Sequence, residues 1–441
     1  MNIHVVKAGE TASAIADEYH IPLKLLLSQN GLKVGEDLVQ GQALLILKPA
    51  LIHTVAPGDT LCRIARQHHI SLRQLYRNNP GLIQKTYIYP GDELVIQYGP
   101  DPGPKISVSG YAYPFIDIST FLEALPFNTI FNSFTWEICP DGSLKGLNDQ
   151  ALVALAKKEG TAPHMVLSNL REPFGFDSAI AHDLLGNPSQ WPDFIQKVME
   201  AVLTHGYSGV DLDFEYVPKE DKAAYARFAS ALSSRLHKSG CRLTIAVSAK
   251  TEDETTSPLT EGLDYKALGE AADAVLLMTY EWGYAAGEPM AVAPIGPVTQ
   301  VVEYAVTRIP PQKLLLGIPN YGYDWPLPWV RDQTRASSVG NQEAINIARK
   351  HHCVIQFDQT AQTPWFTYIH EGREHVVWFE DVRSIRQKLE LILKYQLKGA
   401  GYWNLMRPFT QNWLLLNSLF SVLPGFPKAD PCASHLSAWP H

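Results

Sequence analysis

The apolar residues of this 441-residue chain follow different patterns on either side of a short Pro/Gly-rich segment, residues 98–105. After that segment, short apolar runs alternate with amphipathic stretches, an order that predicts a parallel sheet whose strands are connected by helices. The predicted strands are Ser107–Tyr111, Thr129–Phe134, His164–Asn169, Gly209–Glu215, Arg242–Ser248, Ala274–Tyr280, Lys313–Asn320 and Gly399–Asn404. Runs that are apolar on both faces predict an α/β fold, a (β/α)8 TIM barrel over residues 106–425.

The helical pattern is clearest in Asn148–Lys158, Pro192–Thr204, Ala223–Lys238, Val298–Thr307 and Asp381–Tyr395. The segment between the seventh and eighth strands is too long for a plain loop, and we expect a small α+β insertion over about residues 322–379. Its predicted elements are a helix at Asn341–His351 and strands near Val354–Phe357, Trp365–Ile369 and Val376–Trp378. Residues 426–441 show no period, and we expect a disordered or loosely docked tail.

An internal repeat occupies the first hundred residues. The segment His4–Asn30 matches His53–Asn79, and each is followed by a loop and a short apolar strand. We therefore expect two small domains, residues 1–48 and 50–97, each with the order strand, helix, helix, strand. Thr11 and Thr60 occupy the expected N-cap positions of the first helices. The prolines of residues 98–105 predict a stiff linker.

Composition and charge exclude several classes of partner. The net charge is −8 with no basic block, so we expect no nucleic-acid partner. No run of 18 apolar residues exists, so we expect no membrane insertion. The amino terminus lacks a basic region followed by an apolar core, and therefore no classical signal peptide is expected. We expect a monomer.

One stretch concentrates the candidate chemistry. From Val210 the sequence VDLDFE alternates strictly, so Asp211, Asp213 and Glu215 fall on one face of the predicted strand. Carboxylates two residues apart on a strand lie only ~6.6 Å apart, and this proximity raises the proton affinity of at least one. A carboxylic acid that stays protonated near neutral pH is suited to general acid catalysis. A solvated acidic edge strand and a metal site remain open alternatives.

The stretch SGVDLDFE resembles the DxxDxDxE motif of glycoside hydrolase family 18, which includes chitinases and related glucosaminidases. The resemblance implies that Glu215 is the catalytic acid, that Asp213 assists it and that Asp211 is the next acid inward, sharing a proton with Asp213. It also implies a retaining, substrate-assisted mechanism that needs no metal and no cofactor. Ser208 stands where the motif has its first aspartate, and we expect this departure to touch the buried proton-sharing chain.

Two further motifs extend the resemblance. MTYE at Met278–Glu281 is similar to the family's Met-x-Tyr-Asp element, which implies that Tyr280 orients the substrate's acetamido group. Trp403 matches the tryptophan that floors the subsite at the cleavage point. Aromatic and polar residues gather at six predicted strand ends, where they suit sugar rings, although a plugged barrel mouth is the alternative. The expected substrate-binding residues are Tyr111, Trp136, Met278, Glu281, Asn320, Tyr321 and Trp403.

MTYEWGY, PMAVAPIGPV and PNYGYDW together look most like the spore-associated branch of the family. The resemblance implies a spore cortex peptidoglycan N-acetylglucosaminidase that hydrolyses β-1,4 bonds and is associated with the cortex or coat. A hydrolase of chitin oligomers, a non-catalytic glycan-binding protein and a metal-dependent phosphoesterase or deacetylase are alternatives. Glu215 argues against the non-catalytic protein, and the lack of His at the predicted strand ends argues against the metalloenzyme.

The two repeat units resemble LysM modules, which bind N-acetylglucosamine-containing glycans such as peptidoglycan and chitin. The resemblance implies a groove between the Gly9–Thr11 turn and the loop after Asn30, with an equivalent in the second module. The expected glycan contacts are Gly9, Thr11, Asn30, Gly58, Asp59, Thr60 and Asn79. Two weak sites on one polymer gain avidity. The alternative is a pair of spacer domains that pack on the enzyme.

Overall fold

The structure is a computed structural model that describes residues 1–83, 87–99, 103–171, 173–253 and 255–426. A parallel barrel forms its centre, and it is closed because its first strand pairs with both the second and the last. The barrel strands are β5 (Lys105–Ala112), β6 (Ile130–Ile138), β8 (Ala162–Ser168), β11 (Gly209–Asp213), β12 (Arg242–Ser248), β13 (Ala274–Met278), β14 (Leu314–Pro319) and β20 (Gly399–Trp403). The predicted TIM-type barrel is confirmed.

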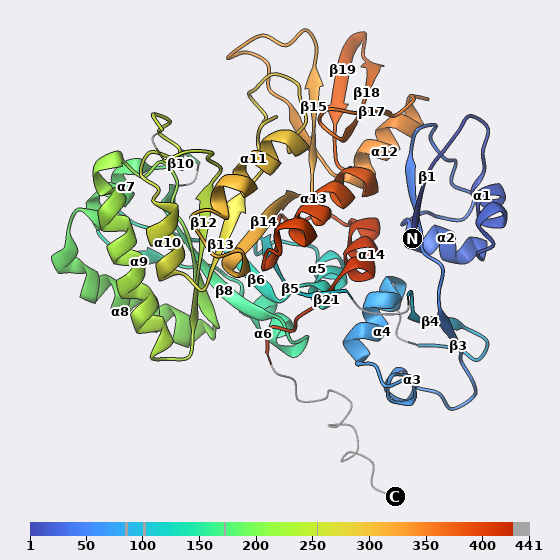
Figure 1. The fold of residues 1–441 in the computed structure, drawn as a ribbon, viewed down its shortest axis with the longest axis horizontal. Coiled ribbons are helices and arrows are strands. Elements are labelled where there is room, and N and C mark those ends of the chain that lie inside the picture. The colour runs from blue at the N-terminus through green and yellow to red at the C-terminus, as the bar shows by residue number, and fades with distance from the viewer. Residues whose placement is uncertain (84–86, 100–102, 172, 254, 427–441) are drawn as a thin grey trace, which may run out of the picture.

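Helices cover the outside of the barrel (Figure 1). They are α5 (Ile118–Ala124), α6 (Gln150–Lys158), α7 (Ser178–Leu185), α8 (Trp191–His205), α9 (Lys222–His237), α10 (Tyr265–Ala271), α11 (Ile295–Ala305), α13 (Val382–Tyr395) and α14 (Thr410–Leu419). The largest apolar cluster fills the layer between these helices and the strands. Short strands β7 (Leu144–Lys145), β9 (Leu170–Arg171), β10 (Gly175–Phe176) and β21 (Ser421–Val422) flank the barrel. Within the described ranges, no helix is both long and apolar enough to cross a membrane.

The segment between β14 and β20 forms a five-stranded antiparallel sheet with one helix against it. Its elements are β15 (Gly322–Pro326), β16 (Ser337–Val339), α12 (Asn341–Lys350), β17 (Gln356–Asp358), β18 (Thr363–His370) and β19 (Arg373–Trp378). The sequence patterns indicated the helix and the last three strands but missed β15 and β16. Tyr323 and Trp325 follow the seventh barrel strand in the sequence but belong to this second sheet, because β15 pairs with β16 and β19.

The first hundred residues form two modules of the same design. The first contains β1 (Asn2–Val5), α1 (Ala12–Tyr19), α2 (Leu23–Gln29) and β2 (Ala43–Ile46), and the second contains β3 (Leu51–Thr54), α3 (Leu61–Gln67), α4 (Leu72–Asn78) and β4 (Glu93–Gln97). Thr11 and Thr60 are the N-caps of α1 and α3, and their hydroxyls accept backbone N–H bonds. The expected linker falls partly on residues 100–102 and the expected tail on 427–441, which lie outside the described residues.

The first module is docked on the insertion. Val39 lies in the insertion's own apolar core beside Phe366. The backbone N–H of Ile355 donates to Gln40 O at 2.9 Å. Gly41 has φ +85°, and a Cβ there would lie 1.9 Å from the carbonyl oxygen of Ile355, so only glycine permits this approach. The module and the insertion therefore form one packed unit, side by side in Figure 1.

The second module is attached to the barrel by a buried arginine. Arg73 of α4 is 5% exposed. Its guanidinium donates to the five carbonyl oxygens of Leu125, Pro126, Asn128, Glu159 and Gly160, at distances of 2.5 to 2.8 Å. Burial lowers the pKa of Arg73 to about 10, so it remains charged at neutral pH. Both modules thus pack on the rest of the structure, as the spacer alternative expects, and the loop after Asn30 is itself part of the first module's contact with the insertion.

Replacing Arg73 tests this attachment. Arg73→Ala removes five charge-assisted hydrogen bonds to carbonyl oxygens in a buried seam. Arg77, Thr161 and backbone N–H groups still donate to four of the five carbonyl oxygens, so among the described residues only Glu159 O loses its sole donor. An unsatisfied buried polar group costs about 1–3 kcal/mol, and the lost bonds of the guanidinium add to this. After partial rehydration we expect a loss of about 2–4 kcal/mol in the free energy of unfolding, measured by denaturant titration. Arg63→Ala, which removes an exposed arginine of the same module, is the matched control. Equal stability of the two variants would contradict the role assigned to Arg73.

Candidate active site

The three motif acids lie at the carboxyl end of β11. Asp211 and Asp213 point into the barrel and are 1% and 5% exposed. The strand ends at Asp213, earlier than predicted, so Glu215 belongs to the loop that follows. Asn169, at the end of β8, fixes that loop: its amide accepts from Glu215 N at 3.0 Å and donates to Glu215 O at 2.8 Å. Sequence reasoning missed Asn169, although a polar residue ending a predicted barrel strand was the available signal.

Asp211 and Asp213 have different surroundings. The hydroxyl of Tyr111 donates to Asp211 Oδ2 at 2.8 Å, and the hydroxyl of Thr244 donates to Asp211 Oδ1. Both oxygens of Asp211 are therefore occupied. Oδ1 of Asp213 is buried without a hydrogen-bond partner among the described residues. A buried carboxylate oxygen without a donor is costly, so Asp213 is ready to accept a bond from a ligand.

All three acids have raised pKa values. Burial raises the pKa of Glu215 to about 7, and the charge of Glu281 adds to this effect. Burial also raises the pKa of Asp211 to about 6, against the opposing hydrogen bonds. The pKa of Asp213 lies well above its ordinary value because of burial and then because of the charges on Glu215 and Asp211. Every charged side chain that shifts these pKa values is itself acidic, so no cationic side chain among the described residues offsets the crowding.

Tyr280 and Glu281 lie in the loop after β13, which is separated from β11 by β12. Together with Glu215 they line a cavity of about 230 Å³, whose other lining residues are Ser248, Ala249, Leu259, Met278 and Trp282. No hydrogen bond ties the Tyr280 hydroxyl to another described side chain. Glu281 accepts hydrogen bonds from Tyr321 and, at 3.0 Å, from Tyr323. The structure therefore places Tyr280 and Glu281 in one cavity with Glu215, and Tyr321 is connected to that cavity through Glu281.

Trp403 ends β20 among aromatic rings. The rings of Tyr111, Tyr113 and Phe134 meet it edge-on, with centroids 5.8, 6.2 and 4.8 Å away. Met278 packs in the same interior cluster. These contacts hold the indole at the mouth of the barrel and leave part of it exposed, as a stacking surface for a sugar ring requires.

Two expected substrate contacts lie elsewhere. Trp136 is 5% exposed in the layer between the barrel and the helices, where its indole N–H donates to Tyr207 at 3.0 Å. The pairing of β6 with β8 is irregular between Ser133 and Trp136, so Trp136 does not share the face of Phe134 as strict alternation would require. The amide of Asn320 donates to two backbone carbonyls of the loop after β20 and is buried. Both predictions are therefore wrong as to direct contact.

Ser208 also differs from expectation. It precedes β11 at the amino-terminal end of the strand, where its N–H donates to Pro163 O at 2.7 Å. Strand alternation places its side chain on the face opposite Asp211. The serine therefore removes no group from the contacts of the buried acids, and the expected effect of this departure on the proton-sharing chain has no structural basis.

The expected LysM residues divide into two groups. Gly9 and Gly58 adopt φ +79° and +85° in open turns next to the capping threonines. Asn30 and Asn79 instead bond backbone groups of their own modules, and Asp59 accepts from His53 and from Ala56 N. Direct glycan contact by these three side chains is thus not supported, because they shape the loops. Exposed Val34, Tyr87 and Tyr89 on those loops were missed.

Comparison with known proteins assigns the chain to a family. The model described as glycosyl hydrolases family 18 matches residues 175–407, and the LysM domain model matches residues 4–46 and 53–97. The chain belongs to glycosyl hydrolase family 18. Within the described residues, no cluster of three or more His, Cys, Asp or Glu side chains is arranged to hold a metal ion.

Several similar proteins cover nearly the whole chain. A cortical fragment-lytic enzyme of Bacillus subtilis is 37% identical over 430 residues, covering 96% of this chain and 99% of that protein. The putative sporulation-specific glycosylase YdhD of the same organism is 34% identical over 432 residues, with the same coverage. The crystal structure of the Bacillus cereus spore cortex-lytic enzyme SleL superposes with a TM-score of 0.82 at 34% identity, covering 97% of this chain and 99% of that one.

The pKa of Glu215 makes stability depend on pH. Between about 4.5, the ordinary value, and about 7, the unfolded chain loses the proton that the folded chain retains. The free energy of unfolding therefore falls with rising pH by about 1.4 kcal/mol per unit from this group. Glu215→Gln removes the group, so we expect the variant's stability relative to wild type to increase from pH 4.5 to 7 and then level off. Glu220→Gln, at an exposed site, is the control, and a pH-independent difference for Glu215→Gln would contradict the assignment.

Proposed function

We propose that this protein is an N-acetylglucosaminidase that hydrolyses β-1,4 bonds of spore cortex peptidoglycan or its fragments by a retaining, substrate-assisted mechanism. Family membership supports glycoside hydrolysis. Relatives named as cortical fragment-lytic or cortex-lytic enzymes match this chain over its two modules as well as its barrel, which favours the same substrate here. The protein would then reside in the spore, retained at the cortex or coat by its glycan ligand.

The observation that carries the mechanism is the unpartnered oxygen of Asp213 beside Glu215, whose pKa is raised to about 7. A hydrolase with a carboxylate nucleophile has no need of an acetamide, whereas this oxygen is suited to accept an acetamide N–H. The Tyr280 hydroxyl, which carries no hydrogen bond to another described side chain, is suited to donate to the acetamide oxygen. Two groups of opposite hydrogen-bonding type therefore fit the two ends of one N-acetyl group.

The residues act in sequence in this proposal. Glu215 gives its proton to the glycosidic oxygen while the acetamide oxygen attacks the anomeric carbon and forms an oxazolinium ion. Asp213 accepts the acetamide N–H and offsets the positive charge that develops on the ring. Glu215, now ionised, removes a proton from water, which opens the oxazolinium ion with net retention. A pKa near 7 suits both roles of Glu215 at neutral pH.

The LysM modules hold the enzyme on the polymer. Their match to the LysM domain and the open turns at Gly9 and Gly58 support binding to N-acetylglucosamine-containing glycan. Because both modules are docked rather than tethered, a bound glycan chain keeps a fixed orientation to the barrel. Two sites on one strand raise the local substrate concentration.

Glu215→Gln separates binding from turnover. Glutamine is nearly isosteric and cannot donate the proton, so we expect turnover of purified cortex fragments to fall by roughly 10²–10⁴-fold. The variant should still sediment with insoluble cortex as wild type does. Muropeptide analysis by mass spectrometry and a pelleting assay provide the two readouts. More than a tenth of wild-type activity in the variant would show that another group is the acid.

The N-acetyl group of the cleaved sugar is the second test. A glycan deacetylated at that sugar lacks the internal nucleophile and should resist cleavage, and thiazoline analogues of the oxazolinium ion should inhibit. The matched comparison uses the same oligomer before and after chemical deacetylation, followed by re-acetylation to restore cleavage. Efficient hydrolysis of the deacetylated oligomer would contradict the substrate-assisted mechanism and would favour Asp213 as a covalent nucleophile.

A further inference from the structure

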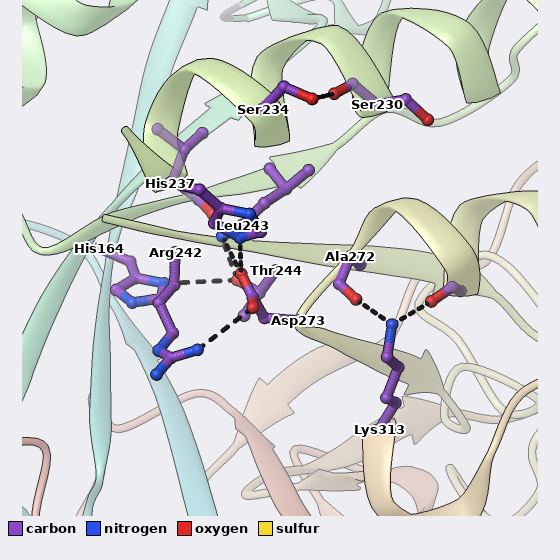
Figure 2. A network of polar contacts seen from close by, with 12 residues as sticks. His164, Ser230, Ser234, His237, Arg242, Leu243, Thr244, Ala272, Asp273 and Lys313 are labelled. Carbon is purple, nitrogen blue, oxygen red and sulfur yellow. Dashed lines mark hydrogen bonds and ion pairs between the residues drawn. The ribbon is translucent and has the colours of Figure 1, made fainter. Parts of the chain in front are cut away.

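A chain of polar side chains continues from Asp211 into the barrel interior, away from the substrate. Thr244 of β12 lies directly across from Asp211 in the strand register, and its hydroxyl donates to Asp211 Oδ1. His164 of β8 lies next in line, with Nδ1 at 3.4 Å from Thr244 Oγ1. Figure 2 shows this contact, with Arg242 and Asp273 beside it. The mechanism above uses neither Thr244 nor His164.

This row of polar side chains is shielded from solvent. His164 and Thr244 are 2% and 4% exposed. The His164 ring fills the space above Gly209, where a Cβ would lie 2.7 Å from Nε2. Burial lowers the pKa of His164 to about 4, so the imidazole is neutral in the working range and carries a single N–H.

The number of hydrogens then fixes the direction of the bonds. The Thr244 hydroxyl has one hydrogen. When the hydroxyl donates this hydrogen to Asp211, its oxygen presents only a lone pair to His164. His164 must then donate a hydrogen bond from Nδ1–H. Without that donor the hydroxyl can turn to the alternative acceptor, the carbonyl oxygen of Val210 at 3.5 Å. His164 therefore decides whether Asp211 keeps its second donor.

We propose that His164 and Thr244 are positioning residues of the reaction: His164 orients the Thr244 hydroxyl toward Asp211, and this bond keeps Asp211 ionised beneath the Asp213–Glu215 pair. The inference rests on the proposed function, in which Asp213 must receive the acetamide. With both oxygens of Asp211 occupied by donors, the proton that the acids share stays within the Asp213–Glu215 pair, from which Glu215 passes it to the glycosidic oxygen while Asp213 is ionised.

The groups that face Asp211 come from several elements. Tyr111 of β5 and Thr244 of β12 bond it directly, and His164 of β8 reaches it through Thr244. Its charge also acts on Asp213 of β11, Tyr280 after β13 and Tyr225 of α9. Arg242 and Asp273 act on His164 with opposite signs. None of these groups is a cation in contact with Asp211, so the two hydroxyl donors are what favour its ionised form.

Losing one donor therefore raises the pKa of Asp211 above its present value of about 6. Activity that requires ionised Asp211 falls as the pH drops through this value, so the acid limb of the kcat profile should move to higher pH. We expect a shift of about one pH unit for Thr244→Val. The pH profile should become narrower, because the basic limb, due to Glu215 near pH 7, stays in place. Thr244→Ser retains the hydroxyl and should restore the acid limb of the wild type.

His164 is tested with two variants. His164→Leu removes the donor and should shift the acid limb in the same direction as Thr244→Val. His164→Asn retains an N–H near the position of Nδ1 and should leave the limb close to wild type. Thr129→Val is the matched control, because Thr129 is another buried barrel threonine whose hydroxyl bonds only backbone groups. Its profile should keep both limbs.

A second readout needs no substrate. Each variant is unfolded in denaturant at pH values from 4 to 8. In Thr244→Val and His164→Leu, but not in the other variants, the raised pKa of Asp211 should make the free energy of unfolding continue to fall up to a higher pH. If the wild-type protein fails to cleave cortex fragments, the proposed function is wrong. The stability measurement still tests whether His164 and Thr244 control the ionisation of Asp211. Unchanged pH dependence in both Thr244→Val and His164→Leu overturns the proposal, as does a shift in Thr244→Val without one in His164→Leu.

Discussion

The crowding of three carboxyl groups inside a barrel, with no cationic side chain among the described residues shifting their pKa values, is the constraint around which the site is built. Burial disfavours their charges, and their proximity disfavours them further, so protons remain bound at neutral pH. The fold provides hydroxyl donors from β5 and β12 to one acid, and in the proposed mechanism the other two acids hold the mobile proton. A metal or an arginine at this position would relieve the crowding and remove the acid catalyst with it.

The rigidity of the surroundings makes this arrangement possible. Paired strands fix Asp211 opposite Thr244, and Asn169 holds the loop that carries Glu215 by two backbone bonds. The aromatic ring contacts of Trp403 fix the expected sugar platform on the far side of the barrel mouth. An acid whose pKa depends on its neighbours keeps that value only while the neighbours stay in place, and barrel strands supply that stability.

The amino-terminal modules are part of the same body. Arg73 binds five carbonyl oxygens of the barrel, and Val39 enters the core of the insertion. In the proposed function the modules do more than concentrate the enzyme on a polymer, because their docking sets the angle at which a bound polymer meets the barrel. This differs from avidity through a free linker, in which the linker length sets the local concentration.

The sequence alone determined the features that depend on local pattern. Alternating apolar runs specified the barrel strands, the repeat specified two modules of one design, and the period of VDLDFE placed three acids on one face. Tertiary structure decided what depends on neighbours distant in the sequence. The irregularity in β6 turned Trp136 outward, the partners of Asn30 removed it from the surface, and the register of β11 with β12 brought Thr244 to Asp211. Each of these depends on pairing between separate segments, and the pattern within a single segment contains no information about which partner it meets.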